Sequence, residues 1–306
     1  MSGESDFRLT EQRNPRTDGI DRLAPLEIVE LINSEDRKVA PAVFEVREAV
    51  ARAIELAEDA LRAGGRMIYV GAGTSGRLGV LDASEMPPTF GTDPVCVQGV
   101  IAGGEEALTR AVEGAEDQAE AGAAEMDRLE VDADDFVLGI AASGTTPYVH
   151  GALGRAVDRG ARTGFLLCTY PQPDHVERYD VVIAPLVGPE VITGSTRMKA
   201  GTATKLVLNT LSSGVMIRLG KVFGNLMVDL RASNRKLQDR SERILMEMCD
   251  VDRDGARQML EDADGSVKLA IVMYWTGADA DHARQLLRKT GGRLGDLQGT
   301  ESERDG

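Results

Sequence analysis

The sequence has few cysteines, and the three that it has form no pattern. Its 306 residues include Cys96, Cys168 and Cys249, which are far apart, odd in number and without the spacing of metal ligands. This argues against a disulfide scaffold and favours a reducing cytoplasm as the protein's setting. The three histidines, His150, His175 and His282, match no ligand spacing either. We therefore expect no bound metal and no metal-dependent hydrolysis.

Long hydrophobic runs and an excess of positive charge are also missing. No apolar run approaches the ~20 residues of a membrane span, and the polar amino terminus has no apolar core of the kind that a secretory signal needs. We expect a soluble, cytoplasmic protein. Lys and Arg number 35 against 50 Asp and Glu, a net charge of −15. This balance argues against binding nucleic acid over a broad surface, which requires a basic footprint, but it does not exclude a small anionic ligand.

Short apolar segments alternate with helical segments along much of the chain. Such segments, when separated by helices, are typical of a parallel sheet buried on both faces. The pattern predicts an α/β fold, with helices on both faces of a parallel sheet in residues 40–233. An arm and helix precede it in residues 1–39, and a small helical subdomain follows in residues 234–306. The expected strands are Arg66–Val70, Val95–Val100, Phe136–Ala141, Gly164–Cys168 and Val181–Ala184. After Ser195 we expect helices only.

A glycine-rich turn follows the first expected strand. Residues 71–76 read Gly-Ala-Gly-Thr-Ser-Gly, which matches the dinucleotide-binding pattern, but Asp93 precedes the second strand and so lies at the wrong end of the sheet to hold a ribose. No Gly-Lys-Ser/Thr follows, which excludes a Walker loop. Thr74, Ser75 and Gly76 instead suit a phosphate, because small residues let backbone N–H groups approach an anion at a helix start.

A second turn of the same kind follows the third expected strand. It contains Ser143, Gly144, Thr145 and Thr146, and Pro147 is well placed to open a helix. Ligands of open α/β sheets bind outside the carboxyl ends of the strands, where both turns lie. The alternative is that these hydroxyls only cap two ordinary helices.

Two groups of carboxylates lie near these turns in the sequence. Glu85 precedes Pro87-Pro88, which we expect to end the helix, so that Glu85 lies in or beside a turn. Glu113 and Glu116 are three apart, and we expect them to share one face of the helix after the second strand. Taken alone, each carboxylate could equally be a solvated surface acid.

Several long motifs together resemble one family. They are VGAGTSGRLGVLDASEMPPTFG, IAGGEEALTRAVEGAEDQ, GIAASGTTPYV, GPEVITGSTRMKAGTATKLVLNTLS and GKVFGNLMVDL. Over about residues 20–235 they are similar to the N-acetylmuramic acid 6-phosphate etherases, and the glucokinase regulatory proteins share part of the signature. The resemblance implies the sugar-isomerase fold, a flavodoxin-like three-layer sandwich that binds phosphosugars. It also implies cleavage of a lactyl ether without a cofactor, in cell-wall amino-sugar recycling.

The resemblance also assigns residues. It implies that Glu85 and Glu116 are catalytic, with Glu113 as a sugar contact. The phosphate ligands that it implies are the residues of the two turns, Thr74, Ser75, Gly76, Ser143, Gly144, Thr145 and Thr146. The segment 193–201 offers Arg197 and Lys199 to an anionic sugar, or else these cations pair with local acids such as Glu190. The family is typically homodimeric, with helices such as Leu206–Leu219 at or near the interface.

Two other functions compete with the etherase. One is a non-catalytic phosphosugar sensor, such as a glucokinase regulatory protein or the sugar-binding half of a repressor. The chain has neither the length for a duplicated sugar domain nor a basic helix-turn-helix segment. The other is a phosphosugar isomerase, which shares the aldehyde chemistry but needs no leaving-group acid. The etherase is the leading hypothesis.

Overall fold

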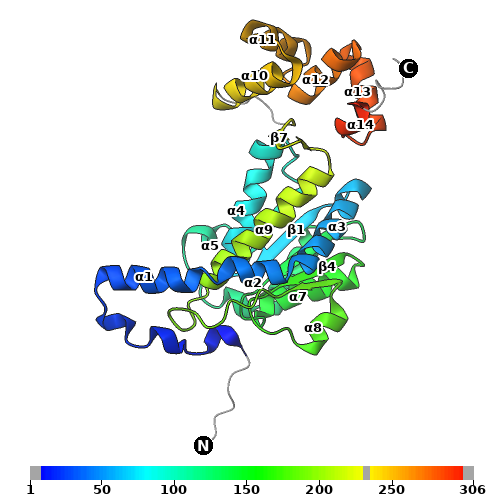
Figure 1. Ribbon diagram of the computed structural model, residues 1–306. Helices are drawn as coiled ribbons and strands as arrows, with labels where there is room; N and C mark the ends of the chain where they lie inside the picture. Colours follow the sequence, from blue (N-terminus) through cyan, green and yellow to red (C-terminus); the bar gives the residue numbers. More distant parts are fainter. Residues whose placement is uncertain (1–7, 230–234, 299–306) are drawn as a thin grey trace, which may run out of the picture. The chain divides into compact units, whose positions relative to one another are not determined.

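A computed structural model describes residues 8–229 and 235–298 (Figure 1). Contacts divide the chain into two compact units. Unit 1 takes its residues from the ranges Met1–Ser84 and Pro94–Ser212, and unit 2 from Glu85–Asp93 and Ser213–Gly306. The predicted domain boundary at residues 233 and 234 lies outside the described residues. Within the described ranges, no helix is both long enough and apolar enough to cross a bilayer.

Unit 1 contains a five-stranded parallel sheet, as the sequence predicts. The strands are β1 (Met67–Gly71), β2 (Val97–Ile101), β3 (Phe136–Ile140), β4 (Arg162–Leu166) and β5 (Val181–Ile183). Their order is β2-β1-β3-β4-β5, the flavodoxin-like order. Met67 of β1 lies opposite Val97 on one side and Phe136 on the other. All five predicted strands are confirmed, and each end agrees to within two residues.

Helices cover both faces of this sheet, so the predicted three-layer sandwich is confirmed. On one face, Ile68, Val70 and Val137 pack in one apolar cluster with residues of α6 (Ala119–Arg128) and α7 (Pro147–Asp158). Alternate residues point to the opposite face. There, Gly79 of α4 (Gly73–Phe90) comes so close to the sheet that an added Cβ would lie 2.9 Å from Cβ of Tyr69.

Three helices precede the sheet: α1 (Pro25–Asp36), α2 (Val39–Glu45) and α3 (Arg47–Ala63). The last two are separate helices because the chain leaves helical geometry at Val46 (φ −101°, ψ 15°). Helix α3 ends at glycine. Gly64 adopts the left-handed conformation (φ 93°), which lets its N–H bond back to the final helical turn.

The amino-terminal arm, residues 8–24, is fastened to distant parts of unit 1 by hydrogen bonds. The Leu9 N–H donates to Oγ1 of Thr169 at 2.9 Å. The Thr17 hydroxyl donates to the Val191 carbonyl at 2.9 Å, and the Asn14 amide donates to the Pro189 carbonyl at 3.2 Å. The arm therefore holds the segment 187–195, which leads into α9 (Lys199–Arg218).

The double proline does not end its helix, so this prediction is wrong. Helix α4 continues through Pro87 and Pro88 to Phe90. Each proline removes one hydrogen bond of the helix. However, the N–H of Gly91 still bonds to the Pro87 carbonyl at 3.0 Å, and the side chains of Met86 and Phe90 are buried. Tertiary burial of these two side chains outweighs the local cost of the prolines.

Unit 2 is mainly helical, as predicted for this end of the chain. Its helices are α10 (Arg235–Cys249), α11 (Arg253–Asp262), α12 (Val267–Thr276), α13 (Ala280–Lys289) and α14 (Gly295–Gln298). They share one apolar cluster that includes Leu245, Leu260 and Ile271. The prediction of helices only after Ser195 is wrong at one place, because β6 (Val222–Phe223) and β7 (Leu226–Met227) form a short hairpin. Gly224 takes the positive φ that its two-residue turn requires.

Two further helices complete the sheet unit. They are α5 (Glu106–Thr109), after β2, and α8 (Pro173–Arg178), before β5. All three cysteines of the chain are free thiols, and Cys168 and Cys249 are buried. Burial raises the pKa of the Cys168 thiol to about 12, so it stays protonated and unreactive at neutral pH.

Candidate functional site

The two predicted phosphate loops lie side by side at the carboxyl edge of the sheet. Loop 1 (residues 71–76) follows β1, and loop 2 (residues 142–146) follows β3, its hydrogen-bonded neighbour. The strand order reverses between these two strands, since β2 lies on one side of β1 and β3 on the other. Ligands of open α/β sheets bind at such a switch point. The structure thus brings the two loops together where a ligand site is expected.

Loop 1 leads directly into α4. The helix begins at Gly73, so Thr74, Ser75 and Gly76 form its first turn, where unpaired backbone N–H groups favour an anion. A Cβ on Gly201, in the first turn of α9, would lie 3.6 Å from Cγ2 of Thr74. The start of α9 therefore lies against loop 1.

Gly76 leaves no room for a side chain. A Cβ there would lie 2.6 Å from Cγ1 of Ile101 and 2.7 Å from the carbonyl oxygen of Gly71. Gly76→Ala should therefore displace loop 1 and destabilise the protein by about 1–3 kcal/mol, with weaker binding of inorganic phosphate. Urea unfolding and calorimetric titration would measure the two effects. Gly295→Ala is the control, since Gly295 likewise has no positive φ but nothing lies within 4 Å of its Cβ position; equal phosphate affinity in both variants would contradict the prediction.

Loop 2 keeps its hydroxyl groups at the edge of the sheet. Gly144 has φ 76°, and the hydroxyls of Ser143 and Thr145 lie 3.1 Å apart. Thr146 is the N-cap residue of α7, but its side chain makes no capping hydrogen bond. The Thr146 hydroxyl therefore does not cap the helix, contrary to the alternative.

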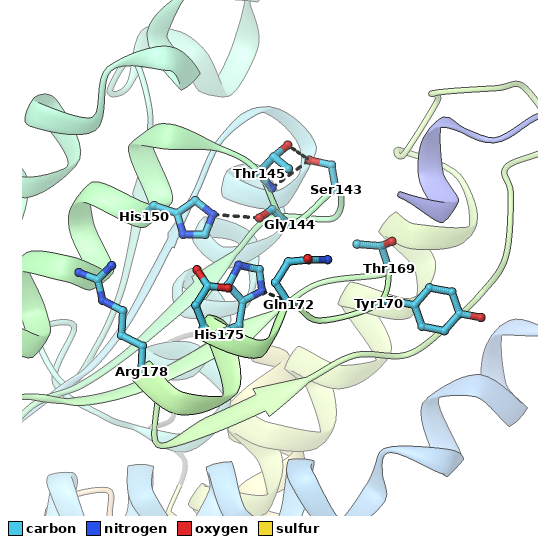
Figure 2. A pocket seen from close by; sticks show the side chains of 10 residues that line it. Ser143, Gly144, Thr145, His150, Thr169, Tyr170, Gln172, His175 and Arg178 are labelled. Carbon is cyan, nitrogen blue, oxygen red and sulfur yellow. Dashed lines mark hydrogen bonds between the residues drawn. The ribbon is translucent and has the colours of Figure 1, made fainter. Parts of the chain in front are cut away.

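A cavity of about 380 Å³ lies under loop 2 (Figure 2). Nε2 of His150 lies 2.9 Å from the Gly144 carbonyl oxygen, and its Nδ1 lies 3.3 Å from the hydroxyl of Tyr179. The ring of His175 stacks on that of His150 with centroids 5.5 Å apart. Neither histidine was predicted as part of this site. His150 follows Thr146 by one helical turn, which is the only local signal that places it beside loop 2.

Burial lowers the pKa of His175. Its Nδ1 accepts a hydrogen bond from the Gln172 N–H at 3.3 Å, which requires an unprotonated nitrogen. The imidazole of His175 is therefore neutral in this arrangement.

A second cavity, of about 200 Å³, is lined by the predicted carboxylates Glu113 and Glu116. We call residues 113–117 the acidic motif and this cavity the acidic cavity. The residues that line the acidic cavity are Ala72, Gly73, Arg77, Ala102, Ala107, Arg110, Ala111, Val112, Glu113, Gly114, Ala115 and Glu116. Loop 1 and the acidic motif are thus walls of one cavity.

Glu113 and Glu116 do not lie on a helix, so that part of the prediction is wrong. Helix α5 ends at Thr109, and Glu116 lies in a single 3₁₀ turn, Ala115–Asp117. Gly114 between the two acids has φ 73°, a conformation that no α-helix contains. The loop nevertheless places both carboxylates in the wall of the acidic cavity.

Glu85 lies within α4, in the part of that helix that belongs to unit 2. Its side chain is exposed to solvent. The predicted turn at Glu85 is absent, because α4 continues beyond it. The catalytic role of Glu85 stays a prediction.

Lys199 does not lie where a substrate ligand would. Its side chain is 1% exposed, and its ammonium group donates to Oε2 of Glu35 at 2.8 Å and to the Val187 carbonyl at 2.9 Å. Glu190 accepts the backbone N–H groups of Lys199 and Ala200 and so caps the start of α9. The structure therefore favours the alternative in which Lys199 pairs with an acid of the protein. The acid that its side chain contacts is Glu35, whereas Glu190 contacts only its backbone N–H. Arg197 is exposed, as an anion ligand would be.

Glu35 is the centre of a buried charge cluster. It is fully buried, and besides Lys199 it contacts Lys38 at 2.6 Å, Arg16 at 3.1 Å and the amide of Asn14 at 3.0 Å. Burial by itself raises the pKa of Glu35. The hydrogen bonds from Lys199, Lys38 and Asn14 outweigh burial and lower the pKa from 4.5 to about 2. The cluster joins the arm to the start of α9.

This pKa predicts a specific acid sensitivity. A carboxyl group with a lowered pKa in the folded state stabilises the protein above pH 4.5, and that contribution is lost as the pH falls toward 2. The unfolding free energy of the wild type should therefore fall more steeply between pH 4.5 and 2 than that of Glu35→Gln. Urea unfolding at several pH values would measure both slopes. Parallel slopes in the two proteins would contradict the prediction.

Comparisons with known proteins show which family and which fold this chain resembles. A family model described as the glucokinase regulatory protein N-terminal SIS domain matches residues 46–157. An N-acetylmuramic acid 6-phosphate etherase of Gloeobacter violaceus is 55% identical over 94% of this chain and 93% of its own length. One of Pectobacterium atrosepticum is 52% identical over 96% of this chain and 98% of its own length. Among solved structures, a phosphoheptose isomerase from Francisella tularensis has a TM-score of 0.49 and 19% identity, covering 64% of this chain and all of that one.

Identity above one half over nearly the whole length of both chains shows common descent as well as a common fold. The matched region includes loop 1, loop 2, the acidic motif and the segment that leads into α9. The chain belongs to the family of N-acetylmuramic acid 6-phosphate etherases.

Proposed function

We propose that this chain cleaves the D-lactyl ether of N-acetylmuramic acid 6-phosphate, giving N-acetylglucosamine 6-phosphate and D-lactate. The function is that of a carbon–oxygen lyase in amino-sugar recycling. One observation carries the proposal: the acidic cavity combines a phosphate loop at a helix start with carboxylates that have no partner among the residues that the structure describes. The curated relatives at 50–55% identity carry the etherase name, which favours this function over a sensor or an isomerase.

The chemistry requires proton transfers at C2 and at the lactyl oxygen, and one water molecule. Ring opening exposes an aldehyde at C1, which acidifies the hydrogen on C2. A base removes this proton, and the bond between C3 and the lactyl oxygen breaks as an acid protonates the departing oxygen. Water then adds to C3 of the unsaturated intermediate, and C2 regains a proton. Carboxyl groups can make such transfers in both directions, and no cofactor is needed.

In this proposal Glu116 and Glu85 are the acid and base, and Glu113 contacts the sugar. Glu116 is exposed and lines the acidic cavity beside Gly73 at the start of α4. The hydroxyls of Thr74, Ser75, Ser143, Thr145 and Thr146, with the backbone at Gly76 and Gly144, bind the phosphate. Their place at the switch point of the sheet supports this assignment.

We also propose a cytoplasmic homodimer. An apolar groove of about 460 Å³ lies between α2, α3 and α9 and is lined mainly by aliphatic and aromatic side chains, among them Val43, Phe44, Ile54 and Leu206. Phe44 is 62% exposed in the single chain. Covering such a surface favours association with a second copy. Sedimentation equilibrium tests this: a mass twice that of the chain is expected, and a monomer at micromolar concentration would contradict it.

Lactate release is the direct test of the reaction. Purified protein incubated with N-acetylmuramic acid 6-phosphate should release D-lactate well above a control without enzyme. Absence of lactate, with binding of the phosphosugar intact, would favour the sensor. In ¹⁸O-labelled water, the label should appear at C3 of the product; retention of the original oxygen would exclude elimination followed by hydration.

A further inference from the structure

The proposed substrate carries two anionic groups, and the loops account for only one. Loop 1 and loop 2 offer hydroxyls and a helix start to the phosphate. The lactyl carboxylate is the second anion, and it is brought to a protein of net charge −15. It is attached through the ether oxygen to C3, where the chemistry occurs. The inference below rests on the proposed function and asks which residue holds this carboxylate.

The lactyl group must lie close to the acidic cavity. An acid/base group that works at C2 and C3 contacts carbons next to the ether oxygen, and the carboxylate lies two bonds beyond that oxygen. Glu113 and Glu116 in the cavity wall would repel it. A neighbouring cation is needed to offset this repulsion. Only two residues that line the cavity are cationic, Arg77 and Arg110.

Arg77 is already committed to the protein backbone. Its Nε donates to the Leu108 carbonyl at 3.1 Å, and its Nη2 donates to the Arg110 carbonyl at 3.0 Å. These carbonyls lie at and just beyond the end of α5, where helical partners run out. Arg77, two residues after Ser75 in α4, therefore fixes the backbone that leads to the acidic motif. Its guanidinium is used for that purpose.

Arg110 is fixed through its backbone but free in its side chain. Its N–H donates to the Glu106 carbonyl at 3.1 Å, and its carbonyl accepts the bond from Arg77. Its guanidinium is exposed and has no hydrogen-bond or ion-pair partner in residues 8–229 and 235–298. It stands three residues before Glu113 and lines the same cavity. A cation held in place without an internal partner is available to a ligand.

We propose that Arg110 binds the lactyl carboxylate of the substrate. The planar guanidinium matches a carboxylate with two parallel N–H···O bonds, which lysine does not reproduce. The carboxylate keeps its charge while the ether bond breaks, so this contact is equally strong before and during the reaction. Such uniform binding lowers KM and leaves kcat nearly unchanged. Arg110 thus selects the lactyl sugar over phosphosugars that have no carboxylate.

A pair of substrates tests the contact. The first is N-acetylmuramic acid 6-phosphate, and the second is the same sugar with the lactyl carboxylate converted to the neutral carboxamide. Arg110→Ala should lower kcat/KM on the acid by roughly 10- to 100-fold, mainly through KM. On the amide, the same variant should stay within about threefold of the wild type. Arg110→Lys, which keeps the charge but not the fork, should lose less than Arg110→Ala on the acid.

Arg52→Ala is the matched control for the loss of one positive charge. Arg52 lies on α3, where it pairs with Glu55 at the surface, so both substrates should react as with the wild type. Equal losses on the acid and the amide in Arg110→Ala would show that Arg110 only shapes the loop, and no loss on the acid would also overturn the inference. If Arg110→Ala fails to fold by circular dichroism, Arg110→Lys provides the same comparison. A wild type that releases no lactate or lactamide would overturn the proposed function and this inference with it.

Discussion

Replacing Glu116 by glutamine should lower kcat by about 10²-fold or more, because glutamine cannot exchange a proton with the sugar. The side chain of Glu116 is exposed and has no hydrogen-bond partner among the described residues. The substitution therefore removes no contact that holds the fold, and its effect reports on the chemistry. Affinity for the product N-acetylglucosamine 6-phosphate, measured by calorimetric titration, should change little since loops 1 and 2 are intact.

The same comparison applies to Glu85, for which the family resemblance implies a comparable role. Glu85→Gln should also cut turnover by about 10²-fold with phosphosugar affinity retained. Glu120→Gln is the control, because Glu120 is another exposed acid, on α6, and it does not line the acidic cavity. Near-normal turnover in either Glu116→Gln or Glu85→Gln would remove that residue from the mechanism.

Glu35→Gln should destabilise the protein by about 3–5 kcal/mol, which is a large part of the stability of an ordinary domain. The variant leaves the ammonium group of Lys199, 1% exposed, without a carboxylate. The ammonium would keep the Val187 carbonyl and a neutral amide oxygen as hydrogen-bond acceptors, but it would lose its counter-charge. A buried charge without a counter-charge is the most costly outcome of breaking an ion pair. Urea unfolding at pH 7 measures the loss.

Lys199→Met separates the structural role from a role in binding. Removing the ammonium leaves Glu35 with Lys38, Arg16 and Asn14, so the loss should be smaller than in Glu35→Gln. The losses of stability in the two single variants should add up to more than the loss measured in the double variant. The folded single variant should keep its KM for the phosphosugar; a large rise in KM without loss of stability would restore Lys199 as a substrate ligand.

The parts of the site that depend on local pattern were predictable from the sequence. Loop 1 and loop 2 are short runs of glycine and hydroxyl residues directly after apolar strands, and parallel strands bring such turns to one edge. The pairing of Lys199 with Glu35 spans 164 residues. No local spacing indicates such a contact, so the sequence left Lys199 either as a ligand of the sugar or as the partner of a nearby acid such as Glu190.

Two other differences between prediction and structure involve signals in the local sequence. One signal was outweighed by packing, and the other was overlooked. The prolines of α4 do discourage a helix, but burial of Met86 and Phe90 decides the outcome. Glu113 and Glu116 have helical spacing, but Gly114 between them takes a positive φ. A glycine inside a supposed helix was therefore the sign that the acidic motif is a loop.

The hydrogen bonds of the amino-terminal arm set a limit on the order of folding. The arm is synthesised well before its partners, since Leu9, Thr17 and Asn14 bond to residues that lie 160, 174 and 175 positions later. At about 5–20 residues per second on the ribosome, the arm waits for roughly 10 to 30 s before these partners exist. During that time Glu35 has no Lys199. Because the arm holds the segment leading into α9, and α9 begins beside loop 1, a segment that is made early is among the last to take its place beside the site.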